Sequence, residues 1–282
     1  MKKIISVVTS SRADYGLLKP LLIELEKSNQ FRLKLLVTGS HLLKNYGYTF
    51  KEINKDGYKE IFKMKVLLNS DTSDGVLKSL ASTIFQSSDI LQKMKSDILL
   101  VMGDRYEIFA IAAVAHVLKI PVAHFSGGEI TEGAIDDAFR HSISKMSQLH
   151  FTSTEIYKKR VIQLGENPKN VFNIGEIGMD NIKNYELFNK EELKKKLGIF
   201  FNKINLLITF HPITLETNTS ELHIKNLLKA LSTQKNTNFI FTLSNADPDN
   251  KIINIYIKNF VNKNKKKSFA FTTLGRLEYL SL

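Results

Sequence analysis

Ionisable side chains gather in one short stretch of this sequence. Carboxylates stand at Glu129, Asp136 and Asp137, and nitrogen-bearing side chains follow at Arg140 and His141. Carboxylates that lie close together raise one another's pKa, which suits them to general acid and base catalysis. Residues four apart share a helix face, so the stretch also fits two ordinary ion pairs, Asp136 with Arg140 and Asp137 with His141.

A second candidate follows the apolar run 97–102, which we predict to be a buried strand. Asp104 and Arg105 stand just after this run. Asp is a common N-cap, so Asp104 by itself could simply cap the next helix. Arg105 beside it makes a purely capping role the weaker interpretation.

Arg12 lies in a polar loop between the first predicted strand and the first helix. Backbone N–H groups at a helix start bind anions, and a guanidinium matches the geometry of phosphate. The loop has neither the Gly-Lys-Ser/Thr of a Walker loop nor a Gly-x-Gly-x-x-Gly pattern, so a nicotinamide site is disfavoured. An ordinary polar loop with an Asp turn stays open as an alternative.

His211 follows a later strand, 204–210. A single His is usually structural, but this one would face an interdomain cleft if two sheets met edge to edge. The mixture of His and carboxylates in the chain could also indicate a metal. Its spacing matches no zinc signature and the chain has no Cys, so we expect no metal site.

The elements that must position these residues alternate between strand and helix. Continuous apolar strands that alternate with helices predict an α/β fold with parallel sheets covered on both faces. In such sheets ligands bind beyond the carboxyl ends of the strands, here after Thr9, Met102, Phe125 and Phe210. The predicted strands are 3–9, 31–38, 97–102, 121–125, 149–152, 204–210, 238–243 and 268–272, and the predicted helices are 17–27, 106–118, 136–146, 221–231 and 249–261.

Length and composition limit the class of protein. The 282 residues are 43% hydrophobic, which favours two domains. The net charge of +12 comes without a nucleic-acid-binding motif, so we expect Lys-rich solvated surfaces and no nucleic-acid partner. No apolar run reaches the roughly 20 residues that span a bilayer, so we expect no membrane partner. The absence of Cys fits a reducing cytoplasm.

Taken in order, these motifs resemble the hydrolysing UDP-N-acetylglucosamine 2-epimerases of bacterial sialic-acid and related nonulosonic-acid pathways. Any one motif is weak, but the ordered set is specific and covers essentially the whole chain. The matching segments are 10–16 (Ser-Ser-Arg-Ala-Asp-Tyr-Gly), 103–105 (Gly-Asp-Arg), 127–129 (Gly-Gly-Glu), 133–137 (Gly-Ala-Ile-Asp-Asp), 140–141 (Arg-His), 209–212 (Thr-Phe-His-Pro), 244–247 (Ser-Asn-Ala-Asp) and 274–280 (Leu-Gly-Arg-Leu-Glu-Tyr-Leu).

The resemblance implies two Rossmann-like domains that face each other across a cleft, the glycosyltransferase-B arrangement. We place the first domain at 1–177 and the second, nucleotide-binding domain at 178–282. The implied reaction removes the C2 proton and UDP to give 2-acetamidoglucal, and water then adds to give N-acetylmannosamine. It implies a UDP-sugar substrate, with a GDP-sugar as the alternative, and no metal or other cofactor. It also implies a cytoplasmic protein that forms a homo-oligomer when full length.

The resemblance also assigns residues. Asp104, Asp136 and His211 match positions that the family treats as catalytic, and Asp137 is an adjacent candidate. Arg12 matches a phosphate contact, while Arg140 and His141 match positions that line the active site. The full prediction is Asp104, Glu129, Asp136, Asp137 and His211 as catalytic residues, and Arg12, Arg105, Arg140, His141, Ser244 and Asn245 as substrate-binding residues.

Two departures from the family pattern bear on these assignments. Relatives often carry Glu where this chain has Ser126, so we expect Glu129 to take over that role. Relatives also continue after Leu282 into a strand and a Gly-x-Ser-Ser-Gly loop that holds the diphosphate. We therefore expect the second domain to be incomplete.

Three other functions stay open at this point. The same chemistry could act on GDP-N-acetylglucosamine or on UDP-diacetylbacillosamine, and Ser126 makes this a serious alternative. A glycosyltransferase of the same architecture would not need the carboxylates at 129–137. A nucleotide-sugar-binding module without turnover is the alternative from a non-enzyme class.

Overall fold

A computed structural model describes residues 2–66, 72–244 and 247–282. The chain forms two compact units, Met1–Lys183 and Asn184–Leu282. The domain boundary predicted at 177/178 lies at the start of helix α7 (Ile177–Asn184), and the two units divide at the end of that helix.

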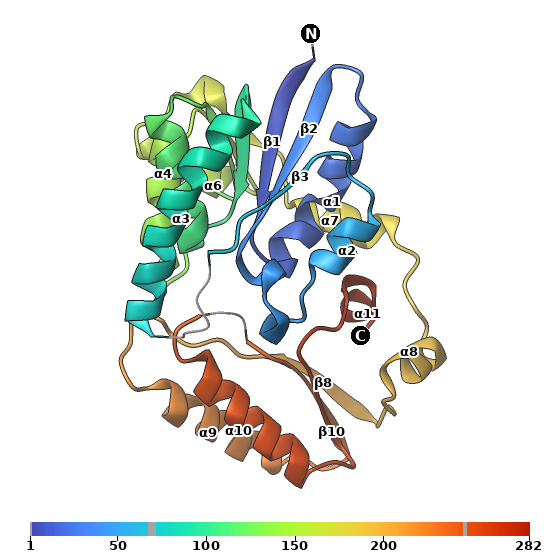
Figure 1. The fold of residues 1–282 in the computed structure, drawn as a ribbon. Helices are drawn as coiled ribbons and strands as arrows, with labels where there is room; N and C mark the ends of the chain where they lie inside the picture. The colour runs from blue at the N-terminus through green and yellow to red at the C-terminus, as the bar shows by residue number, and fades with distance from the viewer. Residues whose placement is uncertain (1, 67–71, 245–246) are drawn as a thin grey trace. The chain divides into compact units, whose positions relative to one another are not determined.

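Unit 1 is built on a parallel sheet of seven strands (Figure 1). Their spatial order is β3-β2-β1-β4-β5-β6-β7, so the order reverses between β1 and β4. Ligands of doubly wound sheets bind beyond the carboxyl ends of the strands at such a reversal. The strands are β1 (Lys3–Thr9), β2 (Phe31–Val37), β3 (Ile61–Lys63), β4 (Ile98–Met102), β5 (Val122–Phe125), β6 (Leu149–Thr152) and β7 (Val171–Asn173).

Helices connect successive strands of this sheet. The predicted helix at 136–146 is confirmed residue for residue, whereas α1 begins at Arg12, five residues before its predicted start. None of the described helices is both long enough and apolar enough to cross a bilayer. The helices of unit 1 are α1 (Arg12–Lys27), α2 (Phe50–Lys55), α3 (Ser73–Met94), α4 (Tyr106–Val117), α5 (Asp136–Met146), α6 (Glu155–Gln163) and α7.

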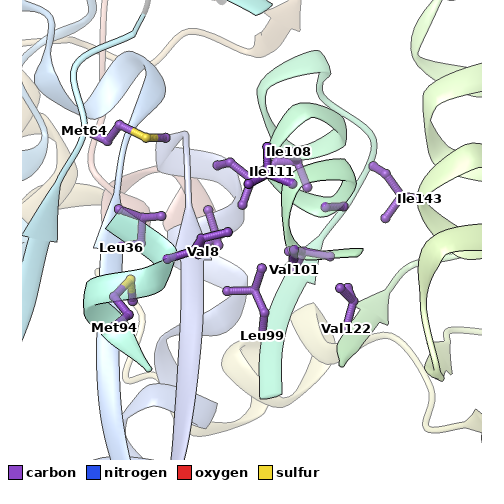
Figure 2. Close-up of a cluster of buried hydrophobic side chains, with 14 of the residues drawn as sticks. Val8, Leu36, Met64, Met94, Leu99, Val101, Ile108, Ile111, Val122 and Ile143 are labelled. Carbon is purple, nitrogen blue, oxygen red and sulfur yellow. The ribbon is translucent and has the colours of Figure 1, made fainter. Parts of the chain in front are cut away.

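The core of unit 1 lies on both faces of the sheet. Successive strand residues point to opposite faces, so Val7 joins a cluster with α1 and Val8 joins a second cluster with α3 and α4. Figure 2 shows the second cluster, which includes Val101 of β4 and Ile111 of α4. Helix α4 is apolar nearly all round and is correspondingly buried. Residues of β1 and β4, the strands that lead into the candidate site, belong to both clusters.

Unit 2 repeats the alternation on a smaller scale. Its three parallel strands lie in the order β10-β9-β8, and Phe239 and Phe241 of the middle strand are fully buried. Both units therefore have the predicted α/β fold with parallel sheets. The elements of unit 2 are α8 (Lys190–Leu197), β8 (Ile204–Thr209), α9 (Ser220–Ser232), β9 (Thr237–Thr242), α10 (Asn250–Lys263), β10 (Ser268–Phe271) and α11 (Arg276–Ser281).

Candidate active site

Asp14 accepts hydrogen bonds from several residues of the loop that follows β1. Ser11 caps α1 in a capping box with Asp14. The Asp14 carboxylate accepts the backbone N–H groups of Ser10 and Ser11 at 3.0 and 2.9 Å, and it also accepts the hydroxyl of Thr9. Burial raises the pKa of Asp14, but hydrogen bonds and the charge of His41 outweigh burial and leave the pKa below its ordinary value. Asp14 therefore stays a carboxylate that rigidifies this loop.

Arg12 is the first residue of α1, next to the reversal of strand order. The N–H groups of Ser10 and Ser11 both donate to Asp14, so these two amides already have a partner within the loop. The phosphate contact assigned to Arg12 stays a prediction.

Asp104 follows β4 on the other side of the reversal. It does not cap α4, because the N-cap is Arg105 and its side chain makes no capping bond. The capping interpretation of Asp104 is therefore wrong. Its carboxylate instead accepts a hydrogen bond from Nη2 of Arg140 on α5. This contact joins two of the predicted site residues from separate elements.

Arg140 also joins Asp104 to Glu129. Its guanidinium is buried, and Nη1 lies 3.8 Å from Oε2 of Glu129. The hydroxyl of Ser153 donates to the other Glu129 oxygen at 3.0 Å. Burial raises the pKa of Glu129, and the carboxylates of Glu176 and Asp104 add to this, against the opposing effects of Ser153 and Arg140. Glu129 therefore keeps a proton more readily than an exposed Glu, as an acid catalyst requires.

His124 of β5 is hydrogen-bonded to the loop that carries Asp104. Its Nε2 lies 2.8 Å from the carbonyl oxygen of Gly103, which can only accept, so Nε2 carries the proton. Nδ1 therefore accepts the hydroxyl of Ser144, 3.0 Å away on α5. Burial lowers the pKa of His124 to about 3, so the ring stays neutral at physiological pH. Helix α5 is thus linked to the 103–104 loop directly through Arg140 and indirectly through Ser144, which bonds to His124.

The paired glycines leave room for this arrangement. A Cβ on Gly127 would lie 2.8 Å from Oγ of Ser144 and 3.1 Å from Nδ1 of His124. Gly128 has a φ of +79°, and a Cβ there would lie 2.4 Å from the carbonyl oxygen of Tyr157. Both glycines therefore let the backbone pack tightly below Glu129, which is a structural role in addition to any approach to substrate.

The other predicted residues of unit 1 lie at the N-cap of α4 and on α5. Arg105 donates through Nε to Glu107 at 2.7 Å, and Glu107 is fully buried. The predicted pair on α5 forms, with Nε2 of His141 3.7 Å from Asp137, whose other oxygen accepts the N–H of Thr131. Asp136 is the first residue of α5. Among the described residues, no three His, Asp or Glu side chains are grouped so that they could hold a metal ion.

The predicted residues of unit 2 follow β8 and β9. His211 lies just beyond β8, and its Nδ1 is 3.3 Å from Oδ2 of Asp247. Ser244 is buried, and both its N–H and its hydroxyl donate to Asn254 at 3.1 Å. Asn245 lies outside the described residues. The carboxylate beside His211 orients the ring so that Nε2 points away from it.

Ser153 and His124 are positioned as functional residues but are absent from the predicted set. Ser153 follows β6, at the carboxyl end of a strand, so the rule that places ligands at this edge could have identified it. His124 lies inside β5 and its contacts come from a distant loop and helix, so no local pattern signals its role.

Arg140→Ala is expected to lower the free energy of unfolding by about 3 kcal/mol, the scale for removing one partner of a buried ion pair. The substitution leaves the carboxylates of Asp104 and Glu129 without their shared cation. Urea unfolding followed by circular dichroism measures the change. Arg32→Ala, which removes the pair between the exposed Arg32 and the partly exposed Glu60, is the matched control and should change stability little. Equal effects in both variants would contradict a buried role for Arg140.

Ser153→Ala is expected to shift the pH profile of kcat/KM upward. The Ser153 hydroxyl stabilises ionised Glu129, so its loss raises the Glu129 pKa further. Whichever protonation state is active, the limb that Glu129 controls moves to higher pH. Because the pKa of Glu129 is raised in the folded state, protonated Glu129 stabilises the fold and its ionisation lowers the free energy of unfolding. This stabilisation is lost as pH rises through the folded-state pKa. Ser232→Ala on α9 is the control, and a downward or absent shift for Ser153→Ala would exclude this role.

Comparison with known proteins shows the family. Residues 23–282 match the family model described as UDP-N-acetylglucosamine 2-epimerase. A Campylobacter jejuni protein named GDP/UDP-N,N'-diacetylbacillosamine 2-epimerase (hydrolyzing) is 43% identical over 281 residues, which are 100% of this chain and 73% of that protein. The Escherichia coli polysialic acid biosynthesis protein P7 is 42% identical, over 94% of this chain and 68% of its own length.

Solved structures agree on the fold. The crystal structure of UDP-GlcNAc 2-epimerase from Neisseria meningitidis superposes with a TM-score of 0.78 at 20% identity, covering 99% of this chain and 74% of that one. A putative UDP-N-acetylglucosamine 2-epimerase from Listeria monocytogenes gives a TM-score of 0.76 at 15% identity, covering 99% and 71%. The glycosyltransferase-B-like α/β fold follows from these matches. Together with the matching family model and the 43% identical relative, they establish that the chain belongs to the UDP-N-acetylglucosamine 2-epimerase family.

Proposed function

We propose that this protein is a hydrolysing 2-epimerase of a nucleotide-linked 2-acetamido sugar. In the first step a base removes the C2 proton, the C1–O bond to the diphosphate breaks, and a C1=C2 double bond forms. In the second step the oxygen of water bonds to C1 and water gives up a proton. C2 receives a proton on the face opposite to the one from which the original C2 proton was removed. The products are the nucleoside diphosphate and the free sugar with inverted C2.

The contact of Arg140 with both Asp104 and Glu129 is the observation that supports this proposal most strongly. Two carboxylates held near one guanidinium, one of them with a raised pKa, suit a reaction that needs both a base and an acid. We assign proton abstraction to Asp104 and proton delivery to Glu129. Asp136, Asp137 and His141 line the same helix α5 as further candidates, and His211 is assigned to the water-addition step.

Two substrates of this chemistry are proposed. With UDP-N-acetylglucosamine the products are N-acetylmannosamine and UDP. N-Acetylmannosamine is the precursor of sialic-acid-like sugars. The named activity of the 43% identical Campylobacter jejuni relative supports a second substrate, UDP- or GDP-linked N,N'-diacetylbacillosamine. Ser126, where relatives often carry Glu, lies in the loop between β5 and Glu129 and adds to the support for the second substrate.

Incubation with each nucleotide sugar in D₂O tests the proposal. Proton addition at C2 from solvent predicts a free sugar with inverted C2 that carries deuterium there, observed by NMR. UDP-N-acetylglucosamine, GDP-N-acetylglucosamine and UDP-N,N'-diacetylbacillosamine are compared by kcat/KM. Products that retain the C2 hydrogen would contradict elimination and rehydration, and an absence of turnover with all three would contradict the proposed function.

Arg12→Ala is expected to raise KM about tenfold and to lower kcat less. A phosphate contact is present before and in the transition state, so its loss is mainly a loss of uniform binding. Arg32→Ala serves as the matched control, because the exposed Arg32 lies on another element, β2, and pairs among the described residues only with Glu60. Steady-state kinetics with the best substrate measures both constants. A fall in kcat with unchanged KM would assign Arg12 to transition-state stabilisation instead.

A further inference from the structure

Arg160 of α6 is bonded to the loop that carries Glu129. Its Nη1 donates a hydrogen bond to the carbonyl oxygen of Gly128, the residue directly before Glu129. A carbonyl oxygen is bound more strongly by a guanidinium than by a neutral donor. The reaction proposed above gives Arg160 no role, although this contact is one peptide away from the acid.

The Gly128 peptide packs closely on α6. A Cβ on Gly128 would overlap the carbonyl oxygen of Tyr157 and would lie 2.9 Å from Cγ2 of Val161. The Arg160 guanidinium lies 5.5 Å from the centroid of the Tyr157 ring, and this attraction helps to hold the guanidinium in place. Helix α6 therefore contacts the Gly128 peptide through both its own backbone and the Arg160 side chain.

The segment that leads into α6 also binds the Glu129 carboxylate. Ser153 directly precedes Thr154, the N-cap of α6, and the Ser153 hydroxyl donates to Oε1 of Glu129 at 3.0 Å. One short segment therefore holds the peptide before Glu129 through Arg160 and the carboxylate through Ser153. Two points of attachment fix the direction of the Glu129 side chain, which a single hydrogen bond would not.

We propose that Arg160 is a positioning residue for Glu129: by holding the Gly128 carbonyl oxygen against α6, it keeps the Glu129 carboxylate beside Ser153 and within reach of the substrate. This inference rests on the proposed role of Glu129 as the acid. An acid must lie within hydrogen-bond reach of the atom that it protonates. Without Arg160 the Gly128 carbonyl oxygen is released, and the peptide that orients Glu129 can rotate.

Arg160→Met removes the donors but keeps the length of the side chain. It should lower kcat by about tenfold or more and change KM less, because a misplaced acid slows the chemical step. Arg160→Lys keeps a charged donor and should recover most of this loss. Lys159→Met is the matched control, since Lys159 is exposed on the same helix and the same charge is removed. Circular dichroism checks folding, and equal kcat in Arg160→Met and Lys159→Met would overturn the proposal.

The pKa of Glu129 gives a readout that needs no turnover. NMR titration of a chain labelled with ¹³C at its Glu carboxyl carbons follows Glu129 in the free protein, and Glu129→Gln identifies its signal. In the otherwise wild-type chain Ser153→Ala should raise this pKa, because the hydroxyl stabilises the carboxylate. In the Arg160→Met chain the same substitution should change the pKa little, because the carboxylate no longer lies beside Ser153. Equal shifts in the two chains would overturn the positioning role.

The kinetic and NMR measurements separate this inference from the proposed reaction. If the wild-type chain turns over none of the three nucleotide sugars, the proposed function fails, and the pKa comparison still decides whether Arg160 positions Glu129. If the wild-type chain turns over and the two pKa shifts are equal, the proposed function stands and the positioning role fails. The charged groups that act on Glu129 from other elements are unchanged in every variant, and they are Asp104, Arg140 and Glu176.

Discussion

Asp104→Asn is expected to lower kcat by about 100-fold or more, the scale for loss of a general base. The amide keeps the size of the carboxylate and one oxygen that accepts from Arg140, but it cannot take a proton. The loop should keep its position, because His124 still holds the Gly103 carbonyl oxygen. Steady-state kinetics with the best nucleotide sugar measures the loss, which should appear in kcat more than in KM.

The same strand offers a matched control for this substitution. Asp97 precedes β4 at its amino end, where it accepts the N–H of Ile4 and pairs with Lys3. Asp97→Asn should leave kcat within about twofold, because that end of a parallel sheet is remote from the ligand edge. Near-normal turnover in Asp104→Asn would remove Asp104 from the proposed mechanism.

His211→Ala is expected to lower kcat by about 100-fold as well, the scale for a general acid or base. Asp247 accepts from Nδ1 of His211 and thereby leaves Nε2 to exchange a proton with substrate or water. In rapid-quench experiments, accumulation of the unsaturated 2-acetamido sugar would locate the loss in the water-addition step. Unchanged kcat would exclude His211 from the chemistry.

Two further variants define what His211 does. Asp247→Asn should lower kcat by less than His211→Ala does, about tenfold, because it removes a group that orients the imidazole and leaves the imidazole in place. His223→Ala is the matched control, since His223 on α9 lies near Glu216 on the surface of the same unit. A larger loss in Asp247→Asn than in His211→Ala would reverse the assigned roles.

Helix α3 shows where sequence patterns lose their information. Its inner face carries the buried Ser79, Thr83 and Ser87, while Leu77 and Phe85 lie outside. The hydroxyls of Ser79 and Thr83 donate to backbone carbonyls four residues earlier at 2.8 and 2.7 Å, so they are satisfied inside the protein. Hydrophobic periodicity assumes that polar residues face water, and therefore no helix was predicted there.

Other elements were predictable because their signals are local. The strands 3–9 and 149–152 and the helix 136–146 have the predicted bounds. β-Branched apolar runs favour buried strands, and repeated alternation of such runs with helices requires parallel pairing. The start of α1 was missed because its capping box lies inside a segment whose polar residues looked like a loop.

The sequence alone determined the α/β class, the strands beyond which site residues stand and the identity of most candidate groups, since these depend on neighbours along the chain. Tertiary structure decided their partners. The Asp104–Arg140 contact joins residues 36 apart, and the His124–Gly103 contact joins residues 21 apart. Both exist because β4 and β5 are adjacent in the sheet and α5 packs against β5 and α4. Such adjacency depends on how the whole core packs, and no local spacing encodes it.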